Sequence, residues 1–406
     1  MARTLHLIVA LLLAAALLPA TALAGGPAAT RAALASQMRF AGGGSGAYAV
    51  DLDSGRTIYA SRADTARTPA SVEKLYTTST ALTLYGTEGR LTTRVLGDVG
   101  VDPGGVLIGN LYLRGGGDPN FGERQAAELA DRLVFEGGLR EVTGRVIGDE
   151  SAFDSLRGPP SEGYRTTNEV GPLSALTFNR GRTGARRPYW QTSPPLSAAR
   201  AFTRALERRD VLVGGAARTG VVQPAALPLA EQSSMTMSEL ALATNRPSDN
   251  FNAETLIKAL GAEFGTAGTT RAGAAVVRRT MAGLGLRPRV ADGSGLSRAN
   301  RTTPRQVVQL LQHMAGDQAG PAFESSLAVA GRNGTLVRRM RSSVARDRCH
   351  AKTGTLNYVS ALAGYCQSTA GARVAFAFLM NGVNVSGAHR LQDRMAAALA
   401  RYSPPS

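Results

Sequence analysis

A serine and a lysine spaced three residues apart could form a nucleophilic pair. They are Ser71 and Lys74, in the stretch Ser71-Val72-Glu73-Lys74. In a helix, residues i and i+3 share one face, so the hydroxyl and the amine can meet. A serine is a weak nucleophile until a neighbouring base takes its proton, and lysine can be that base when burial lowers its pKa. Taken alone, the motif also occurs often by chance, as a capping serine followed by a solvated lysine.

Two other short motifs carry groups that could relay a proton or bind a peptide. In Ser248-Asp249-Asn250, the Ser248 hydroxyl can donate and accept a proton, and the Asn250 amide could bind both a carbonyl and an amine. The same residues could instead cap the helix that follows them. In Lys352-Thr353-Gly354, lysine and threonine could bind a carboxylate, and glycine allows close approach. An ordinary edge strand is the alternative there.

The scarcity of lysine favours a functional interpretation of these motifs. Of the 46 basic residues, three are lysines, namely Lys74, Lys258 and Lys352. Arginine cannot serve as the base, because its guanidinium does not deprotonate in proteins. Two of the three lysines therefore stand where the motifs need an amine.

The elements that position these motifs can be predicted from hydrophobic periodicity. Residues 47–60 alternate and turn at Asp53-Ser54-Gly55, which predicts a β-hairpin. A helix is expected from about Ala70 through Leu82. Between about 91 and 229, short β-like runs alternate with Gly/Pro-rich breaks. Further helices are predicted at 237–244, 251–260, 273–284 and 304–314, then strands at 350–356, 359–366 and 373–380, and a last helix at 387–402. This order predicts an α/β (α+β) fold, with an antiparallel sheet flanked by helices and β-rich units inserted between the first two motifs.

The two cysteines are expected to form a disulfide across the last hairpin. A turn at Asn357-Tyr358 places Cys349 directly opposite Cys366. Opposed residues in antiparallel strands have Cα atoms about 4.5–5.5 Å apart, a separation that a disulfide can span. The bond would brace the strand that carries Lys352. Two unpaired buried cysteines are the alternative.

The three motifs together, in this order, are the signature of penicillin-binding proteins and serine β-lactamases. The separation of 177 positions from Ser71 to Ser248 leaves room for a large insertion. The chain therefore resembles the class C low-molecular-mass penicillin-binding proteins, the D-alanyl-D-alanine carboxypeptidase/endopeptidases. Other stretches that match this family are 109–113, 115–119, 292–298 and 334–336. The resemblance implies the penicillin-binding/β-lactamase-like transpeptidase fold, with a catalytic domain at 25–90 plus 236–406 and an inserted β-rich domain or domains at 91–235.

The resemblance also implies a role for each motif residue. Ser71 would attack the carbonyl of the penultimate D-alanine of a peptidoglycan stem peptide, with Lys74 as general base. Ser248 would pass the proton to the leaving D-alanine, and Asn250 would hold Lys74 and the substrate. β-Lactams would acylate the same serine. No cofactor or metal is implied.

The strand motif supplies the remaining groups that the resemblance implies. Lys352 would provide positive potential, and Thr353 would bind the terminal carboxylate beside Gly354. The backbone N–H groups of Ser71 and Thr355 would form an oxyanion hole. Asp149 falls where family members place an acid that receives the free amine of the substrate's diamino acid, and a turn aspartate is an equally good interpretation.

Residues 1–24 read as a secretory signal peptide. Arg3 precedes an apolar stretch at 5–18, and Ala22-Leu23-Ala24 fits a cleavage site. The stretch is short for a spanning helix, which needs about 20 residues. The mature protein is thus expected outside the cytoplasm, in the periplasm or cell wall, without a stable membrane anchor.

The net charge of +16 does not by itself indicate a nucleic-acid partner. The basic residues are spread along the chain, and aromatic residues make up 5% of it. Nucleic-acid binding is more typical of clustered basic residues with interleaved aromatics. A diffuse attraction to acidic polymers outside the cell is plausible. The sequence leaves the oligomeric state open.

Two rival functions share the motifs. A serine β-lactamase would use the same acylation but hydrolyse β-lactam adducts rapidly, and the long insertion argues against it. A non-catalytic wall-binding or β-lactam-sensing protein would not need both lysines. A Ser-His-Asp arrangement through His350 is a weaker alternative, because Lys74 already fills the role of base.

Overall fold

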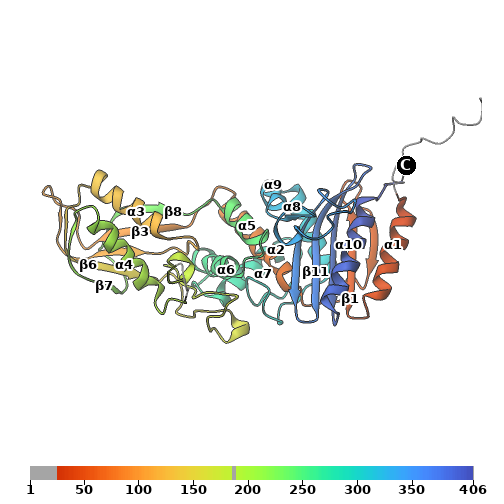
Figure 1. Cartoon of the computed structure of the whole chain (residues 1–406), viewed down its shortest axis with the longest axis horizontal. Coiled ribbons are helices and arrows are strands. Elements are labelled where there is room, and N and C mark those ends of the chain that lie inside the picture. The colour runs from red at the N-terminus through yellow and green to blue at the C-terminus, as the bar shows by residue number, and fades with distance from the viewer. Residues whose placement is uncertain (1–24, 185–188, 406) are drawn as a thin grey trace, which may run out of the picture.

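The computed structural model describes residues 25–184 and 189–405, which form two sheets with helices around them. The predicted signal peptide at 1–24 lies outside the described residues. In Figure 1 the molecule is elongated, with one sheet towards each end and a group of helices between them.

The first sheet has six strands in the order β2-β1-β12-β11-β10-β9, and every neighbouring pair is antiparallel. The strands are β1 Ser45–Asp51, β2 Thr57–Ser61, β9 Ala328–Val329, β10 Cys349–Leu356, β11 Val359–Gln367 and β12 Arg373–Asn381. All seven residues of β1 and the first eight of β11 are buried. Both faces of the sheet are therefore covered, which explains why these strands read as apolar runs rather than strict alternations.

Helices cover the two faces and form two separate cores. On one face lie α1 Pro27–Phe40 and α10 Val385–Ala400. The core of the other face continues through α2, α5, α6, α7, α8 and α9. These helices span Lys74–Tyr85, Met237–Asn245, Asn250–Phe264, Thr270–Gly283, Pro304–Gly316 and Gly320–Ser325. The predicted antiparallel sheet flanked by helices is confirmed.

The strands of the second sheet lie between Thr92 and Ser233. This region contains helices that the sequence analysis did not predict, and several of its strands pair in parallel. Its strands are β3 Thr92–Gly97, β4 Val106–Leu107, β5 Leu111–Arg114, β6 Glu141–Asp149, β7 Leu212–Thr219 and β8 Leu227–Ser233. Strand β6 pairs in parallel with β4, β5 and β7. Two helices, α3 Glu123–Asp131 and α4 Pro194–Glu207, pack on this sheet. Parallel neighbours need such crossovers, because a hairpin cannot join them.

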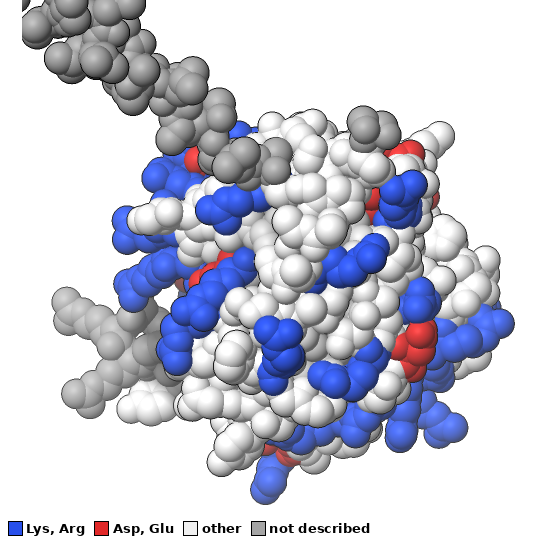
Figure 2. Space-filling model, turned by 90° about the vertical axis from the view of Figure 1, so that its right-hand side faces the viewer, with Lys and Arg blue, Asp and Glu red and all other residues white. Residues whose placement is uncertain are grey.

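Arginines gather on the outer surface of α1, α10 and the nearby segment 336–345. Figure 2 shows this end of the molecule, where basic side chains greatly outnumber acidic ones. The exposed arginines of this basic layer are Arg31, Arg39, Arg338, Arg341, Arg390, Arg394 and Arg401. Helix α1 contains no acidic residue, and the single acid of α10, Asp393, is paired with Arg339 at 2.7 Å. Residues spread along the sequence are thus brought together by the fold.

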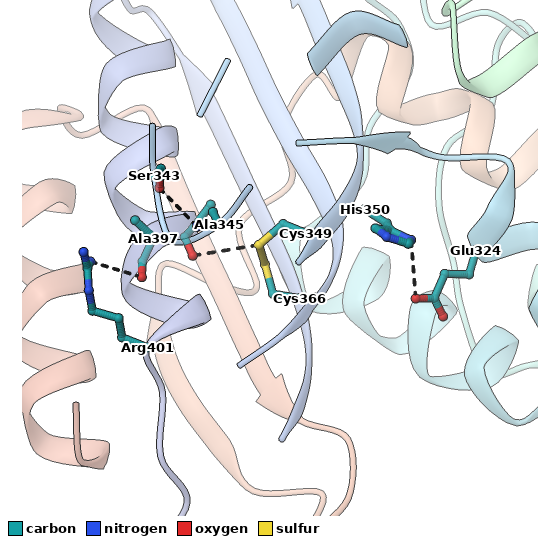
Figure 3. Close-up of a disulfide and its surroundings, with 9 residues drawn as sticks. Glu324, Ser343, Ala345, Cys349, His350, Cys366, Ala397 and Arg401 are labelled. Carbon is teal, nitrogen blue, oxygen red and sulfur yellow. Dashed lines mark hydrogen bonds and ion pairs between the residues drawn. A yellow bond between two sulfur atoms is a disulfide. The ribbon is translucent and has the colours of Figure 1, made fainter. Parts of the chain in front are cut away.

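The last hairpin has the register that the sequence predicts. Cys349 of β10 pairs with Cys366 of β11, and a disulfide joins them with Cα atoms 4.1 Å apart. Figure 3 shows this bond on the face of the sheet covered by α10. It links the two strands three residues from Lys352, outside the cluster of polar groups around Ser71.

Candidate active site

Ser71 lies on a tight turn that leads into α2. The turn is the 3₁₀ segment η1, Ala70–Glu73, and α2 begins at Lys74. Ala70 has a φ of 48°, a left-handed conformation that L-residues seldom adopt. This turn carries Ser71 next to the start of the helix, where developing negative charge is favoured.

The Lys74 amine is fully buried and contacts three oxygen atoms. Its Nζ lies 2.9 Å from Ser71 Oγ, 2.7 Å from Asn250 Oδ1 and 2.6 Å from the carbonyl oxygen of Ser294. The predicted meeting of the first two motifs is therefore present in the structure. Ser294 belongs to the stretch 292–298, which the sequence analysis identified as matching the family but for which it predicted no contact.

Burial lowers the pKa of Lys74 from its usual 10.5 to about 8. Loss of hydration is the main cause, because it penalises the charged form of the amine. Asp292 and Glu254 act in the opposite direction, followed by Asp249 and Glu169. The amine is therefore far easier to deprotonate than an ordinary lysine.

Three buried carboxyl groups lie around this amine, and sequence reasoning assigned none of them a role. Burial raises the pKa of Glu73, Glu254 and Asp292. Glu254 accepts a hydrogen bond from the Ser294 N–H at 2.9 Å, so it fixes the carbonyl that Lys74 contacts. Asp292 accepts from the backbone N–H groups of Gly295 and Ser297. Glu254 and Asp292 therefore hold the 292–298 loop against Lys74.

The Ser248-Asp249-Asn250 motif both caps a helix and completes the site. Asp249 caps α6, because its Oδ1 accepts from the backbone N–H of Asn252 at 2.8 Å. Asn250, the first residue of α6, directs its Oδ1 at Lys74 and donates from Nδ2 to Glu169 Oε2 at 3.0 Å. Ser248 has a φ of 65° and lines a cavity of about 240 Å³ together with Asn250 and Glu169. The two interpretations of this motif are compatible.

Strand β10 passes directly beside the Ser71 turn. A Cβ atom at Gly354 would lie 2.5 Å from the Pro69 carbonyl oxygen and 3.1 Å from the Ser71 backbone nitrogen. Only glycine therefore fits, because any side chain would push the strand away. Thr355, the next residue, is exposed at the end of the strand.

Lys352 and Thr353 lie on the same strand. Lys352 is fully buried and donates to the Thr353 carbonyl oxygen at 2.9 Å. Burial, followed by repulsion from Lys74, holds the pKa of Lys352 well below its usual value. Thr353 Oγ1 contacts Thr335 Oγ1 at 2.8 Å, which ties the strand to the matching stretch 334–336.

Two residues considered from the sequence lie outside this cluster. Asp149 is fully buried in the second sheet, where its oxygens accept backbone N–H groups of Ser151 at 2.7 Å and Val222 at 2.9 Å. These contacts match the turn-aspartate alternative that the sequence left open. His350 points towards Glu324, with Nδ1 3.8 Å from Oε1, as Figure 3 shows. The structure therefore does not place it as a base for Ser71.

The segment 150–184, which follows β6 and is called here the segment between the two sheets, contributes contacts that the sequence did not reveal. Glu169, in the loop that follows η3 (Pro160–Glu162), contacts Asn250. Arg180 donates to Asp249 Oδ2 at 2.6 Å and to Asn252 Oδ1 at 2.7 Å. Both residues come from Gly/Pro-rich stretches, whose patterns carry no periodicity from which their position could be predicted.

The described residues hold no candidate metal centre and no candidate membrane span. Within 25–184 and 189–405, no three His, Cys, Asp or Glu side chains are grouped so as to bind a metal ion. In the same part of the chain, no helix combines the length and apolar character needed to cross a bilayer.

A nucleophilic serine, a buried lysine one turn away, and a loop and a strand beside them define a serine hydrolase of the penicillin-binding class. The chain belongs to the D-Ala-D-Ala carboxypeptidase 3 (S13) family, whose sequence profile matches residues 28–186 and 186–402. It is a low-molecular-mass penicillin-binding protein of the serine-type D-alanyl-D-alanine carboxypeptidase kind.

Individual relatives agree with this assignment. A D-alanyl-D-alanine carboxypeptidase of Actinomadura sp. (strain R39) is 29% identical over 442 residues, which cover 88% of this chain and 81% of the relative. Carboxypeptidase DacB of Mycolicibacterium smegmatis is 28% identical, covering 86% and 78%. The crystal structure of penicillin binding protein 4 from Haemophilus influenzae has a TM-score of 0.76 at 20% identity, covering 89% of this chain and 97% of that one. The last likeness shows that the fold is shared.

Proposed function

We propose that this protein removes the terminal D-alanine from peptidoglycan stem peptides through an acyl-enzyme on Ser71. The observation that carries the proposal is the distance of 2.9 Å between Lys74 Nζ and Ser71 Oγ, inside a site walled by Asn250 and β10. A nucleophile within hydrogen-bonding distance of a buried base is the arrangement that covalent catalysis requires.

Acylation follows from this geometry. Neutral Lys74 takes the Ser71 proton while Oγ forms a bond to the carbonyl carbon of the penultimate D-alanine. The backbone N–H groups of Ser71 and Thr355 stabilise the oxyanion. The C–N bond to the terminal D-alanine then breaks, and Ser248 passes a proton to the departing amine. A water molecule hydrolyses the ester, which returns Ser71 to its hydroxyl form and releases the shortened peptide.

The strand motif binds the leaving group in this mechanism. The buried Lys352 amine supplies positive potential. Thr353 binds the terminal carboxylate. Gly354 keeps the strand close enough to Ser71 for both to reach one substrate. The peptide enters as an additional strand beside residues 352–356, the part of β10 beyond its pairing with β9, since its backbone groups can pair there.

The same nucleophile accounts for acylation by β-lactams and for cleavage of cross-links. A β-lactam carbonyl occupies the position of the scissile amide, and the resulting ester remains on Ser71. Endopeptidase action needs only a larger leaving group at the same carbon.

We further propose that residues 91–235 form an inserted domain, and that 25–90 and 236–406 form the catalytic domain. The mature protein acts outside the cytoplasm after cleavage of residues 1–24.

Labelling with fluorescent penicillin, followed by peptide mapping, tests the nucleophile. We expect one labelled peptide, containing Ser71, and no label in Ser71→Ala. In parallel, a peptide ending in D-Ala-D-Ala should release D-alanine with the wild-type protein only. Fast nitrocefin turnover without D-alanine release would indicate a β-lactamase instead. A stable adduct without turnover of either substrate would indicate a sensing or wall-binding protein.

A further inference from the structure

The proton transfer proposed above requires a particular arrangement of hydrogen bonds on Lys74. A neutral amine has two N–H groups and one lone pair, and Nζ here faces three oxygens. The Ser294 carbonyl can only accept a hydrogen bond, so it takes one N–H. If Asn250 Oδ1 takes the other, the lone pair is left facing the Ser71 hydroxyl. Lys74 can then accept the serine proton.

This arrangement depends on which way the Asn250 amide is turned. If its oxygen and nitrogen exchanged places, Nδ2 would donate to the lone pair of Lys74. The amine would then have no free lone pair for Ser71. A neutral lysine can bond to either end of an amide, so Lys74 alone does not select the productive orientation.

Glu169 faces the other end of that amide. Its Oε2 lies 3.0 Å from Asn250 Nδ2, and a carboxylate can only accept. Turning the amide would place two oxygens against each other, so Glu169 permits only the orientation that leaves the Lys74 lone pair free.

The side chain of Glu169 is exposed, and its backbone is held in place by the packing of the next residue. Val170 is buried in a small cluster with Leu173 and with Phe251, the residue that follows Asn250. Leu296, from the loop that carries Ser294, packs against the same cluster. The Glu169 loop, the start of α6 and the Ser294 loop therefore share one support.

We propose that Glu169 is a positioning residue, which fixes the Asn250 amide so that Lys74 presents its lone pair to Ser71. The inference rests on the proposed acyl-enzyme function. It assigns to the loop that follows η3 an indirect part in proton transfer, through Asn250.

A purely electrostatic role of Glu169 would have the opposite effect on activity. The negative charge of Glu169 raises the pKa of Lys74. Asp292, Glu254 and Asp249 act in the same direction. Two further titratable groups, Lys352 and Glu73, also face this amine. Removing the charge alone would lower the pKa of Lys74. More of the amine would then be neutral below pH 8, and acylation would become faster there.

Glu169→Gln separates the two roles, because glutamine keeps the shape but can bond to either end of the amide. The measurement is the second-order rate of labelling by fluorescent penicillin between pH 6 and 10. We expect labelling to slow by about twofold, because with glutamine neither neighbour selects an orientation of the amide and about half of the molecules hold the productive one. The loss should persist on the plateau above pH 8. Unchanged labelling, or faster labelling below pH 8, would overturn the proposal.

The controls are a second glutamate of the same loop, a second substitution at Glu169, and the site of labelling in the wild-type protein. Glu162→Gln removes an equal charge from the exposed η3 turn and should label at the wild-type rate. Glu169→Ala should be slowed as well, and the thermal midpoints of all variants should agree. If wild-type protein is not labelled at Ser71, the proposed function fails. If it is labelled but Glu169→Gln is unaffected, the positioning role alone fails.

Discussion

At the scale of single residues, Lys74 experiences two opposing influences. Burial lowers the pKa of its amine to about 8, although Asp292 and Glu254 act to raise it. A base works best when its pKa is near the working pH. Glu254 and Asp292 thus hold the Ser294 loop in place and also offset part of the basicity that Lys74 loses through burial.

The pH dependence of acylation should reflect this amine. Only the neutral form of Lys74 can take the Ser71 proton, so the rate should rise with pH through a midpoint near about 8 and then level off. The measurement is the rate of β-lactam labelling over a pH series. A profile whose midpoint lies near the usual lysine pKa of 10.5 would contradict this assignment.

Replacement of Lys74 by arginine should abolish acylation while preserving the positive charge. Arginine does not lose its proton in proteins, so the general-base contribution of about 10²–10⁴ is lost. Labelling rates of Lys74→Arg and wild type, compared at pH 8, measure this effect. Circular dichroism and the thermal midpoint check that the variant is folded. Labelling at more than a tenth of the wild-type rate would argue against Lys74 as the base.

At the scale of elements, the approach of β10 to η1 depends on one missing side chain. In Gly354→Ala, the new Cβ would meet the Pro69 carbonyl oxygen at 2.5 Å. The strand must move away from Ser71, so labelling should fall by more than about tenfold, since misplacement by 1 Å can cost about 10². Gly283→Ala, at the end of α7, introduces a Cβ with no neighbour within 4 Å and serves as the control. Equal labelling rates in the two variants would refute the role of this contact.

The disulfide braces the same hairpin and should contribute to stability more than to activity. A crosslink that closes a loop of about 15 residues stabilises by about 3 kcal/mol in the chain-entropy estimate, and the cysteines are 17 residues apart. The Cys349→Ser/Cys366→Ser protein should unfold at a lower temperature than wild type but keep most of its labelling rate. Reductant should lower the wild-type midpoint and leave that of the double variant unchanged. An identical midpoint for both oxidised proteins would contradict the prediction.

The predictable parts of the fold are those set by local pattern. The turn at Asn357-Tyr358 is enough to fix the pairing of β10 and β11, so the cysteine pair follows from counting residues. The missed elements have weak local signals. Helix α4 begins at Pro194-Pro195, which suggests a break although proline suits the first turn of a helix.

The site was predictable where the chemistry is carried by short motifs, and unpredictable where it depends on convergence. Ser71, Lys74 and Asn250 belong to recognisable short motifs, and the structure brings them together. Glu169 and Glu254 are isolated acids whose approach to the site depends on the tertiary fold. The role of Asp149 stayed open in the sequence because a carboxylate that ends a strand resembles a ligand group until its backbone partners are known.

At the scale of the whole molecule, the basic layer gives the protein an electrostatic orientation. A negatively charged matrix should contact this face first, because its arginines are close together and almost free of acidic neighbours. Arg390→Gln/Arg394→Gln should therefore elute from a cation exchanger at lower salt than Arg204→Gln/Arg208→Gln. Both pairs of arginines are exposed, and both variants lose two charges. Elution at the same salt concentration would show that net charge alone governs adsorption.

The third lysine has a consequence for anyone who tries to trim this enzyme. Lys258, on α6, is buried and donates to Asp154 at 2.5 Å and to the Leu156 carbonyl oxygen at 2.7 Å, both in the segment between the two sheets. A shortened version without residues 91–235 would lose both hydrogen-bond partners of that ammonium, and Glu254 on the same helix would remain as a negative charge near it. Trimming would therefore loosen α6, the helix that also presents Asn250 to Lys74.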